Sequence, residues 1–150
     1  MSTSTMSVRD LWNAAAATLE RWIGLDLVLL AARIGIAAVF FQSGRTKVEG
    51  WLSVSGNAVG LFRDEYRLPI VDPALAAHAA AYAEHLFPLL LALGLGTRFA
   101  ALALLGMTLV IQVFVYPDAW PTHLSWAAPL LLLAARGGGL VAVDRGLGLR

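Results

Sequence analysis

The chain has 150 residues, of which 59% are hydrophobic and 14% are charged, and its formal net charge is +1. Soluble domains carry about 25% charged residues, so this composition excludes an ordinary water-soluble domain and indicates an integral membrane protein whose main partner is the lipid bilayer. The near-neutral charge excludes the basic surface that nucleic-acid binding requires, and the absence of cysteine excludes disulfides and thiolate metal sites.

Residues 1–24 precede the first long apolar run. Within them, apolar side chains such as Trp12 and Leu19 recur at helical spacing, and charged side chains such as Arg9 and Glu20 lie on the opposite face. This pattern predicts an N-terminal amphipathic helix that lies in the plane of the membrane interface. The alternative is a helix that packs on a soluble partner.

Residues 25–150 are predicted to form one all-α transmembrane domain, an antiparallel four-helix bundle. About 20 apolar residues in a helix cross a hydrocarbon core of about 30 Å. Four segments approach this requirement, and the last is the shortest: residues 25–42, 74–95, 99–116 and 122–136. The connector at residues 51–69 is too polar to span and is expected to lie at the membrane surface.

Basic residues predict the orientation of this topology. Four spans place both termini on the same side, and that side carries six arginines: Arg9, Arg21, Arg98, Arg136, Arg145 and Arg150. The opposite side carries four basic residues: Arg45, Lys47, Arg63 and Arg67. The positive-inside rule therefore predicts that both termini are cytoplasmic.

Two ionisable side chains are expected near the middle of the membrane. Arg33 lies about 12 Å along the first span, and Glu84 lies about 15 Å along the second, which runs in the opposite direction. Because an unpaired charge is costly in the bilayer, their matching depth predicts a buried ion pair between Arg33 and Glu84. The pair has two interpretations, a structural pin between helices or a site that handles protons or anions.

Histidines and other polar side chains gather in the outer half of the predicted bundle. One hypothesis is a metal site formed by His78, His85 and His123, because imidazole and carboxylate groups bind Zn, Cu or non-haem Fe. None of their spacings matches a known metal-ligand motif. The other hypothesis is a quinone held between apolar walls by a few polar groups. The residues predicted to contact that quinone are Tyr82, Glu84, His85, Gln112 and Trp126.

Several segments of the chain resemble the DoxX family. They read ARIGIAAVFFQSGRTKVEGW, FRDEYRLPIVDP, AEHLFPLLLALGLGTRFAALALLGMTLVIQVFVYP and THLSWAAPLLLLAARGGGLVAVDRGLG. The resemblance extends from about residue 30 to the C-terminus and implies a four-helix, multi-pass protein of the bacterial inner membrane. It further implies that the characteristic polar positions of the family are Arg33, Lys47, Glu84, Arg98, Gln112 and Asp144.

The family resemblance also implies a range of functions. Some members resemble a subunit of a quinone-linked sulfur-oxidising enzyme, and others are linked to redox stress or metal handling. We therefore expect an accessory subunit that supports membrane redox chemistry, with a membrane or membrane-associated protein partner, rather than a stand-alone enzyme. The alternatives are a metal-handling membrane protein that uses its histidines, and a structural scaffold without a ligand. A homo-oligomer is compatible with all three of these functions.

Overall fold

The computed structural model describes residues 6–149. The first five residues of the predicted interfacial segment, and Arg150, which contributes to the predicted orientation, lie outside the described residues. Three helices in the described part are long and apolar enough to cross a membrane: Leu25–Arg45, Pro73–Leu93 and Thr97–Val115. The chain is therefore a mostly helical membrane protein, as its composition predicts.

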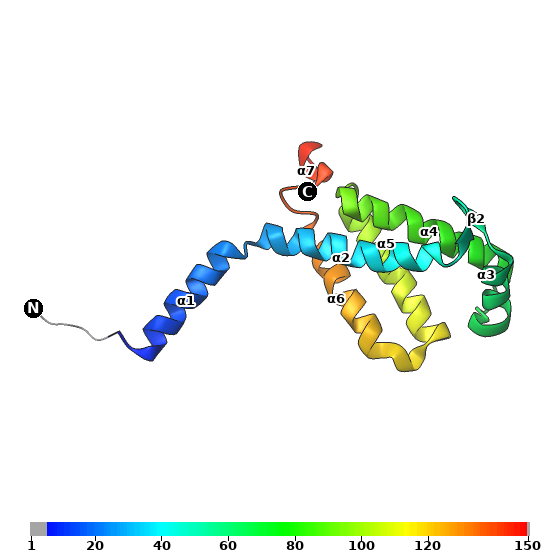
Figure 1. Ribbon diagram of the computed structural model, residues 1–150, viewed down its shortest axis with the longest axis horizontal. Helices are drawn as coiled ribbons and strands as arrows, with labels where there is room; N and C mark the ends of the chain where they lie inside the picture. The colour runs from blue at the N-terminus through cyan, green and yellow to red at the C-terminus, as the bar shows by residue number, and fades with distance from the viewer. Residues whose placement is uncertain (1–5, 150) are drawn as a thin grey trace, which may run out of the picture.

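The first helix, α1 (Val8–Trp22), extends away from the rest of the molecule (Figure 1). A capping box fixes its start, because the Ser7 hydroxyl accepts from the Asp10 N–H at 3.2 Å while the Asp10 carboxylate accepts from the Ser7 N–H at 3.1 Å. None of the 15 residues of α1, all of them described, is buried, and Trp12 and Trp22 are 74% and 80% exposed. The predicted helix is present, and its placement at the membrane surface remains a prediction.

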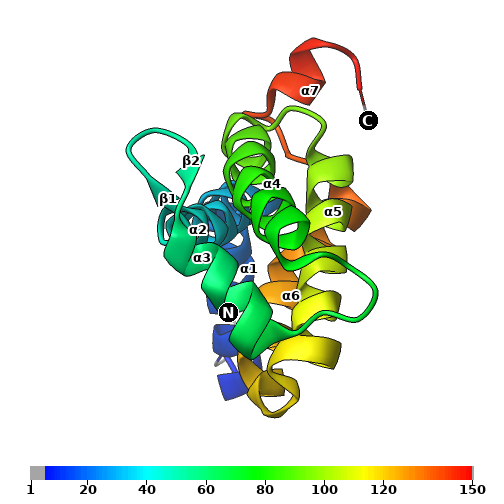
Figure 2. The ribbon, with the colours of Figure 1, turned by 90° about the vertical axis from the view of Figure 1, so that its right-hand side faces the viewer.

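The core lies between four longer helices. These are α2 (Leu25–Arg45), α4 (Pro73–Leu93), α5 (Thr97–Val110, continued by the π-helical segment η2, Ile111–Val115) and α6 (Trp120–Arg136). Fully or almost fully buried apolar side chains from all four form one cluster, which includes Leu29, Phe40, Leu91, Leu104 and Leu130. Figures 1 and 2 show that α5 diverges from α4 beyond the short turn that joins them.

Local signals place the helix ends within a few residues of the predicted boundaries. Asp72 caps α4 by accepting the Leu75 N–H at 3.0 Å, with Pro73 in the first turn. Gly94 ends α4 in the left-handed conformation, with φ of +70°. The last of the four helices, α6, has 17 residues, or about 25 Å of rise. It is slightly longer than the segment predicted at residues 122–136.

The connector between α2 and α4 folds back over the start of α4 (Figure 1). It contains a short antiparallel hairpin, β1 (Val48–Glu49) and β2 (Ser53–Val54), followed by α3 (Gly56–Leu61) and the π-helical segment η1 (Phe62–Tyr66). Phe62 is 5% exposed and packs in a second small apolar cluster with Ala76 and Ala77. The hairpin is a minor departure from the predicted all-α architecture. A short 3-10 helix, η3 (Pro117–Ala119), precedes α6, and the short helix α7 (Val143–Gly146) follows it near the end of the chain.

Candidate functional site

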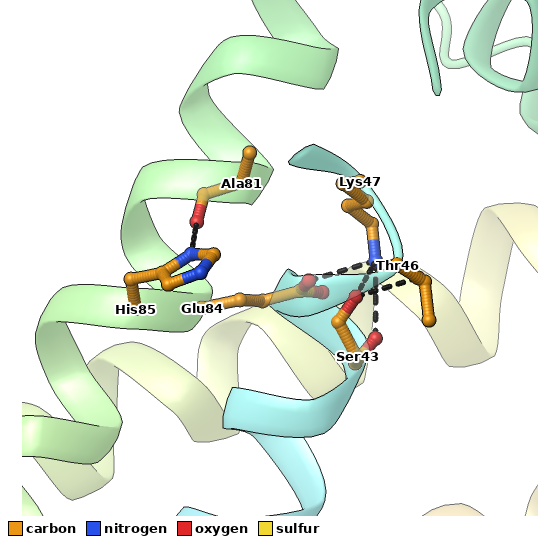
Figure 3. A network of polar contacts seen from close by, with 6 residues as sticks. All are labelled: Ser43, Thr46, Lys47, Ala81, Glu84 and His85. Atoms are coloured by element: carbon orange, nitrogen blue, oxygen red, sulfur yellow. Dashed lines mark hydrogen bonds and ion pairs between the residues drawn. The ribbon is translucent and has the colours of Figure 1, made fainter. Parts of the chain in front are cut away.

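A buried ion pair joins the end of α2 to the middle of α4 (Figure 3). Lys47 Nζ lies 2.7 Å from Glu84 Oε2, and the two residues are 6% and 3% exposed. Lys47 also donates to the Ser43 carbonyl at 3.2 Å and to the Ser43 hydroxyl at 3.0 Å. The three N–H bonds of the ammonium are thus all used, and the buried carboxylate of Glu84 has a partner.

The predicted ion pair between Arg33 and Glu84 is wrong, since Glu84 pairs with Lys47. Arg33, which is 2% exposed, donates instead to three backbone carbonyls: those of Leu91 at 2.8 Å, Ala92 at 2.7 Å and Gly138 at 3.0 Å. The carbonyls of Leu91 and Ala92 belong to the last turn of α4, where carbonyls lack the usual N–H donor four residues on; Leu91 also accepts the capping Gly94 N–H at 3.0 Å. Arg33 therefore ties the end of α4 to the segment after α6.

The register of α2 against α4, together with the direction of helical side chains, explains this correction. Side chains lean toward the N-terminus of their own helix, and α2 and α4 run in opposite directions, with Gly44 beside Glu84 and Arg33 beside Leu91. Arg33 consequently leans toward the start of α2 and the end of α4, whereas Glu84 leans toward the start of α4 and Lys47. Because Gly44, eleven residues after Arg33, is the residue beside Glu84, Arg33 and Glu84 lie about 16 Å apart along the helices, and the matching depth expected from the sequence is wrong.

Polar side chains at the Arg33 end of the molecule cap helix termini. The Asp144 carboxylate accepts from the Gly96 N–H at 2.6 Å and the Thr97 N–H at 2.8 Å, at the start of α5. Arg98 donates to the last carbonyls of α6, at Ala134 and Ala135, with distances of 2.6 Å and 2.7 Å. Burial alone would raise the pKa of Asp144, but the two N–H donors and the nearby guanidinium of Arg33 lower it below its ordinary value.

A cavity of about 440 Å³ lies at the opposite end, bounded by α2, η1, α4, the α5–η2 helix and α6. Its walls are mostly apolar. The polar side chains on them are Ser43, Lys47, Tyr66, Glu84, Tyr116, His123 and Trp126. Ala79 of α4 and Val110 of α5 line the cavity and are also exposed. The cavity therefore opens on the lateral surface of the molecule, where α4 and α5 diverge.

The α6 side of the cavity carries a hydrogen-bonded histidine. His123 is 5% exposed, and its Nδ1 lies 2.7 Å from Gln112 Oε1. Trp126, one turn further along α6, packs against the His123 ring with 5.3 Å between ring centroids. At the mouth of the cavity, the Tyr116 hydroxyl donates to Glu65 of the connector and so ties η1 to the end of η2.

Only some of the five residues predicted to contact a quinone line the cavity. Glu84 and Trp126 line the cavity, and Gln112 lies behind His123. His85 is buried next to the ion pair, but its ring turns back to the Ala81 carbonyl at 2.6 Å (Figure 3). Tyr82 is 48% exposed and is not part of the cavity wall.

The three predicted metal ligands are not brought together. His78 and His85 each contact a carbonyl one turn earlier in α4, at 2.7 Å and 2.6 Å, and His123 is held by the side chain of Gln112. Within residues 6–149, no group of three or more His, Cys, Asp or Glu side chains is placed to hold a metal ion.

Ser43 is not among the residues singled out from the sequence, and Lys47 is predicted to lie on the outer side of the membrane without being paired with Glu84. Ser43 and Lys47 are four positions apart, a spacing that places side chains on one face of a helix. A lysine just beyond a span can also extend its aliphatic stem into apolar surroundings. Together these two signals would have identified Lys47 as a partner for a buried carboxylate.

Comparison with known proteins matches the chain to a family. A family model described as DoxX matches residues 28–117, which is more than half of the chain. The chain belongs to the DoxX family. The DoxX match includes Arg33, Lys47, Glu84 and Gln112, whereas His123 and Asp144 lie beyond its end.

A protein of Haemophilus influenzae that is named as uncharacterized is 29% identical to this DoxX-family chain over 132 residues. The similarity covers 81% of this chain and 84% of the Haemophilus protein. No solved structure matches the chain. The family assignment thus supports the membrane fold, and the chemistry of the cavity has to be argued from its own residues.

Proposed function

We propose that this DoxX-family protein binds a quinone-type, lipid-soluble ligand in the cavity between α2, α4, α5 and α6, as an accessory subunit of membrane redox chemistry. The observation that carries the proposal is the cavity itself. Ligand sites of about 300–1,000 Å³ with apolar walls and a few placed polar groups are typical of small-molecule binding. A ring with polar groups at its edge and an apolar tail matches walls of this composition.

The lateral opening supports a ligand that arrives from the bilayer. Ala79, Ala80 and Ala83 give α4 a small-residue face toward the cavity, and Met107 and Val110 line it from α5. A quinone that is dissolved in lipid would enter between these helices without crossing water. A water-soluble substrate gains nothing from such an entrance.

The proposal also includes a membrane topology. Helices α2, α4 and α5 cross the membrane, and α6 completes an antiparallel four-helix bundle because it shares their buried core. The amphipathic helix α1 lies in the interface, where its exposed tryptophans meet lipid. Both termini face the cytoplasm of a bacterial inner membrane. The outer lateral faces of the helices remain available for a protein partner or a second copy.

Quenching of tryptophan fluorescence tests ligand binding, because Trp126 lies on the cavity wall. Decylubiquinone is titrated into the protein in lipid nanodiscs. We expect saturable quenching, and Ala83→Leu, which fills the cavity, should weaken binding about tenfold or more. The matched control is Ala128→Leu, at an exposed position of α6 outside the cavity, which should bind as the wild type does. Equal, non-saturating quenching of all three proteins would show that the probe only partitions into lipid.

A further inference from the structure

The hydrogen bonds behind His123 fix the position of its proton. Gln112 has two different polar atoms on its side-chain amide, and one of them lies 2.7 Å from the Pro117 carbonyl oxygen. A carbonyl oxygen only accepts hydrogen bonds, so the atom that faces it is the amide nitrogen, Nε2. The amide oxygen, Oε1, therefore faces His123.

The orientation of Gln112 in turn selects the tautomer of His123. An amide oxygen only accepts, so His123 Nδ1, at 2.7 Å from Oε1, carries the hydrogen. In a neutral imidazole the second nitrogen, Nε2, is then an acceptor with a free lone pair. His123 Nε2 makes no hydrogen bond with the described residues, and the ring lines the cavity.

The Lys47 ammonium in the cavity wall has no spare donor to offset this acceptor. Each N–H bond of the Lys47 ammonium already has a partner in Ser43 or Glu84. Glu84 contributes carboxylate oxygens, which accept hydrogen bonds. Tyr66 and Trp126 have donor groups elsewhere on the wall, and these can serve a quinone or a quinol, so His123 Nε2 is the group that would distinguish a ligand hydroxyl from a carbonyl.

On this basis, and resting on the function proposed above, we infer that His123 accepts a hydrogen bond from a ligand hydroxyl, so that the cavity selects the reduced quinol over the quinone. A quinol has two O–H donors where the quinone has two carbonyl acceptors. A quinone carbonyl next to His123 would face a lone pair, or would require the other tautomer and cost the hydrogen bond to Gln112. Sites that are built to bond a ligand hydroxyl reject analogues without it, because the buried partner is left unpaired.

The test compares three probes under anaerobic conditions at neutral pH: decylubiquinone, its quinol, and the dimethyl ether of that quinol. We expect the wild type to bind the quinol about tenfold more tightly than the quinone, as one hydrogen bond of about 1.4 kcal/mol would give. The ether, which keeps the ring but has no O–H, should bind as weakly as the quinone. His123→Leu should bind all three probes with similar affinity.

A second variant keeps the test decisive if His123→Leu does not fold. Gln112→Leu retains the imidazole and releases the constraint on its tautomer, so the preference for quinol should fall several-fold while binding persists. Nitrogen-15 NMR of labelled histidine reports independently which ring nitrogen of His123 carries the proton. A proton on Nε2 in the wild type would overturn the inference.

The outcomes separate the two proposals. If the wild type binds quinol and quinone equally, and Ala83→Leu loses both, the cavity is a ligand site and His123 does not select the reduced form. If the wild type binds neither probe, the proposed function fails and the role of His123 fails with it.

Discussion

Lys47 and Glu84 neutralise each other in surroundings where neither charge could remain alone. Both side chains are at least 93% buried, and the only polar groups that contact the ammonium within the described residues come from Ser43 and Glu84. Taking a charge out of water costs several kcal/mol, and only a close partner recovers that cost. Each member of the pair therefore stabilises the folded state only while the other is present, because either charge alone would be buried without a partner.

Removing one partner of this pair should be worse than removing both. We expect Lys47→Met to lower the free energy of unfolding by about 3–5 kcal/mol, because Glu84 is left buried and unpaired. Lys47→Met/Glu84→Leu should recover most of that loss. Unfolding of the detergent-solubilised proteins, followed by circular dichroism, measures the difference.

A second mutant cycle, with Arg33→Leu and Glu84→Leu, is the control. Arg33 and Glu84 share no hydrogen bond or ion pair within residues 6–149, so their effects should add. Strong coupling between Arg33 and Glu84, or additive effects for Lys47 and Glu84, would contradict the observed pairing.

Helices α2 and α4 approach each other closely where Gly44 faces the Glu84 region. A Cβ added at Gly44 would lie 2.9 Å from His85 Nδ1 and 3.0 Å from Glu84 Cβ. Those distances are shorter than van der Waals contact, and the His85 ring is held by its bond to the Ala81 carbonyl. The missing side chain at Gly44 thus sets the spacing that lets Lys47 reach Glu84.

Gly44→Ala should destabilise the protein, although alanine is the better helix former by about 1 kcal/mol. We expect a net loss of about 1–3 kcal/mol, typical of overpacking in a close contact. Gly35→Ala, in the same helix, is the matched control, because a Cβ there would meet no described atom within 4 Å; it should be neutral or slightly stabilising. Equal effects of the two substitutions on the thermal unfolding midpoint would argue against close packing at Gly44.

The start of α5 depends on Asp144, more than forty residues away in the chain, because the N-cap residue, Gly96, has no side chain to cap the helix. We expect Asp144→Asn to cost about 1 kcal/mol at pH 7. The pKa of Asp144 is lowered in the folded state. The stabilisation that ionised Asp144 provides is therefore fully present above the pKa of the carboxyl in the unfolded chain, about 3.9. It is lost as the pH falls through the lower pKa of the folded state.

The difference in unfolding free energy between wild type and Asp144→Asn should therefore shrink as the pH falls below about 4. Thermal unfolding in detergent between pH 7 and pH 3 measures it. A difference that stays constant over this range would show that the ionised carboxylate does not stabilise α5.

At the scale of the whole molecule, the three membrane-capable helices and the approximate helix ends follow from the sequence. Long apolar runs predict spans, and Asp72 with Pro73, Gly94 and Gly137 are ordinary signals for helix ends. These are local properties, which a single sequence records. The α1 helix is of the same kind, since its periodicity and its capping box are both local.

The candidate site was only partly predictable. Glu84 and Gln112 stand out because polar groups are unusual in apolar spans, and Trp126 because its N–H can donate to a quinone; all three lie at or behind the cavity wall. The predicted partner of Glu84 is wrong, because helical rise within each span does not fix the register between two helices: α2 and α4 pair with Gly44, not Arg33, beside Glu84. The cavity itself follows from the divergence of α4 and α5, which no local pattern encodes.

The proposed topology makes a prediction for the intact cell. Because the sequence contains no cysteine, single substitutions can report which side of the membrane a residue occupies. Ser7→Cys and Arg145→Cys should resist a membrane-impermeant maleimide in spheroplasts and react after lysis, whereas Ser53→Cys in the hairpin should react without lysis. All three positions are exposed in the structure. Labelling of Ser7→Cys from outside would reverse the orientation.

Native mass spectrometry of the protein, extracted from its own membrane in mild detergent, tests ligand binding in the cavity most directly. We expect that part of the wild type carries an added mass equal to a quinone or quinol, that Ala128→Leu retains this mass, and that Ala83→Leu loses it. A bare chain or simple oligomer in the wild-type spectrum, or an added mass that Ala83→Leu keeps, would contradict the account. The cavity would then be a packing feature of a scaffold protein.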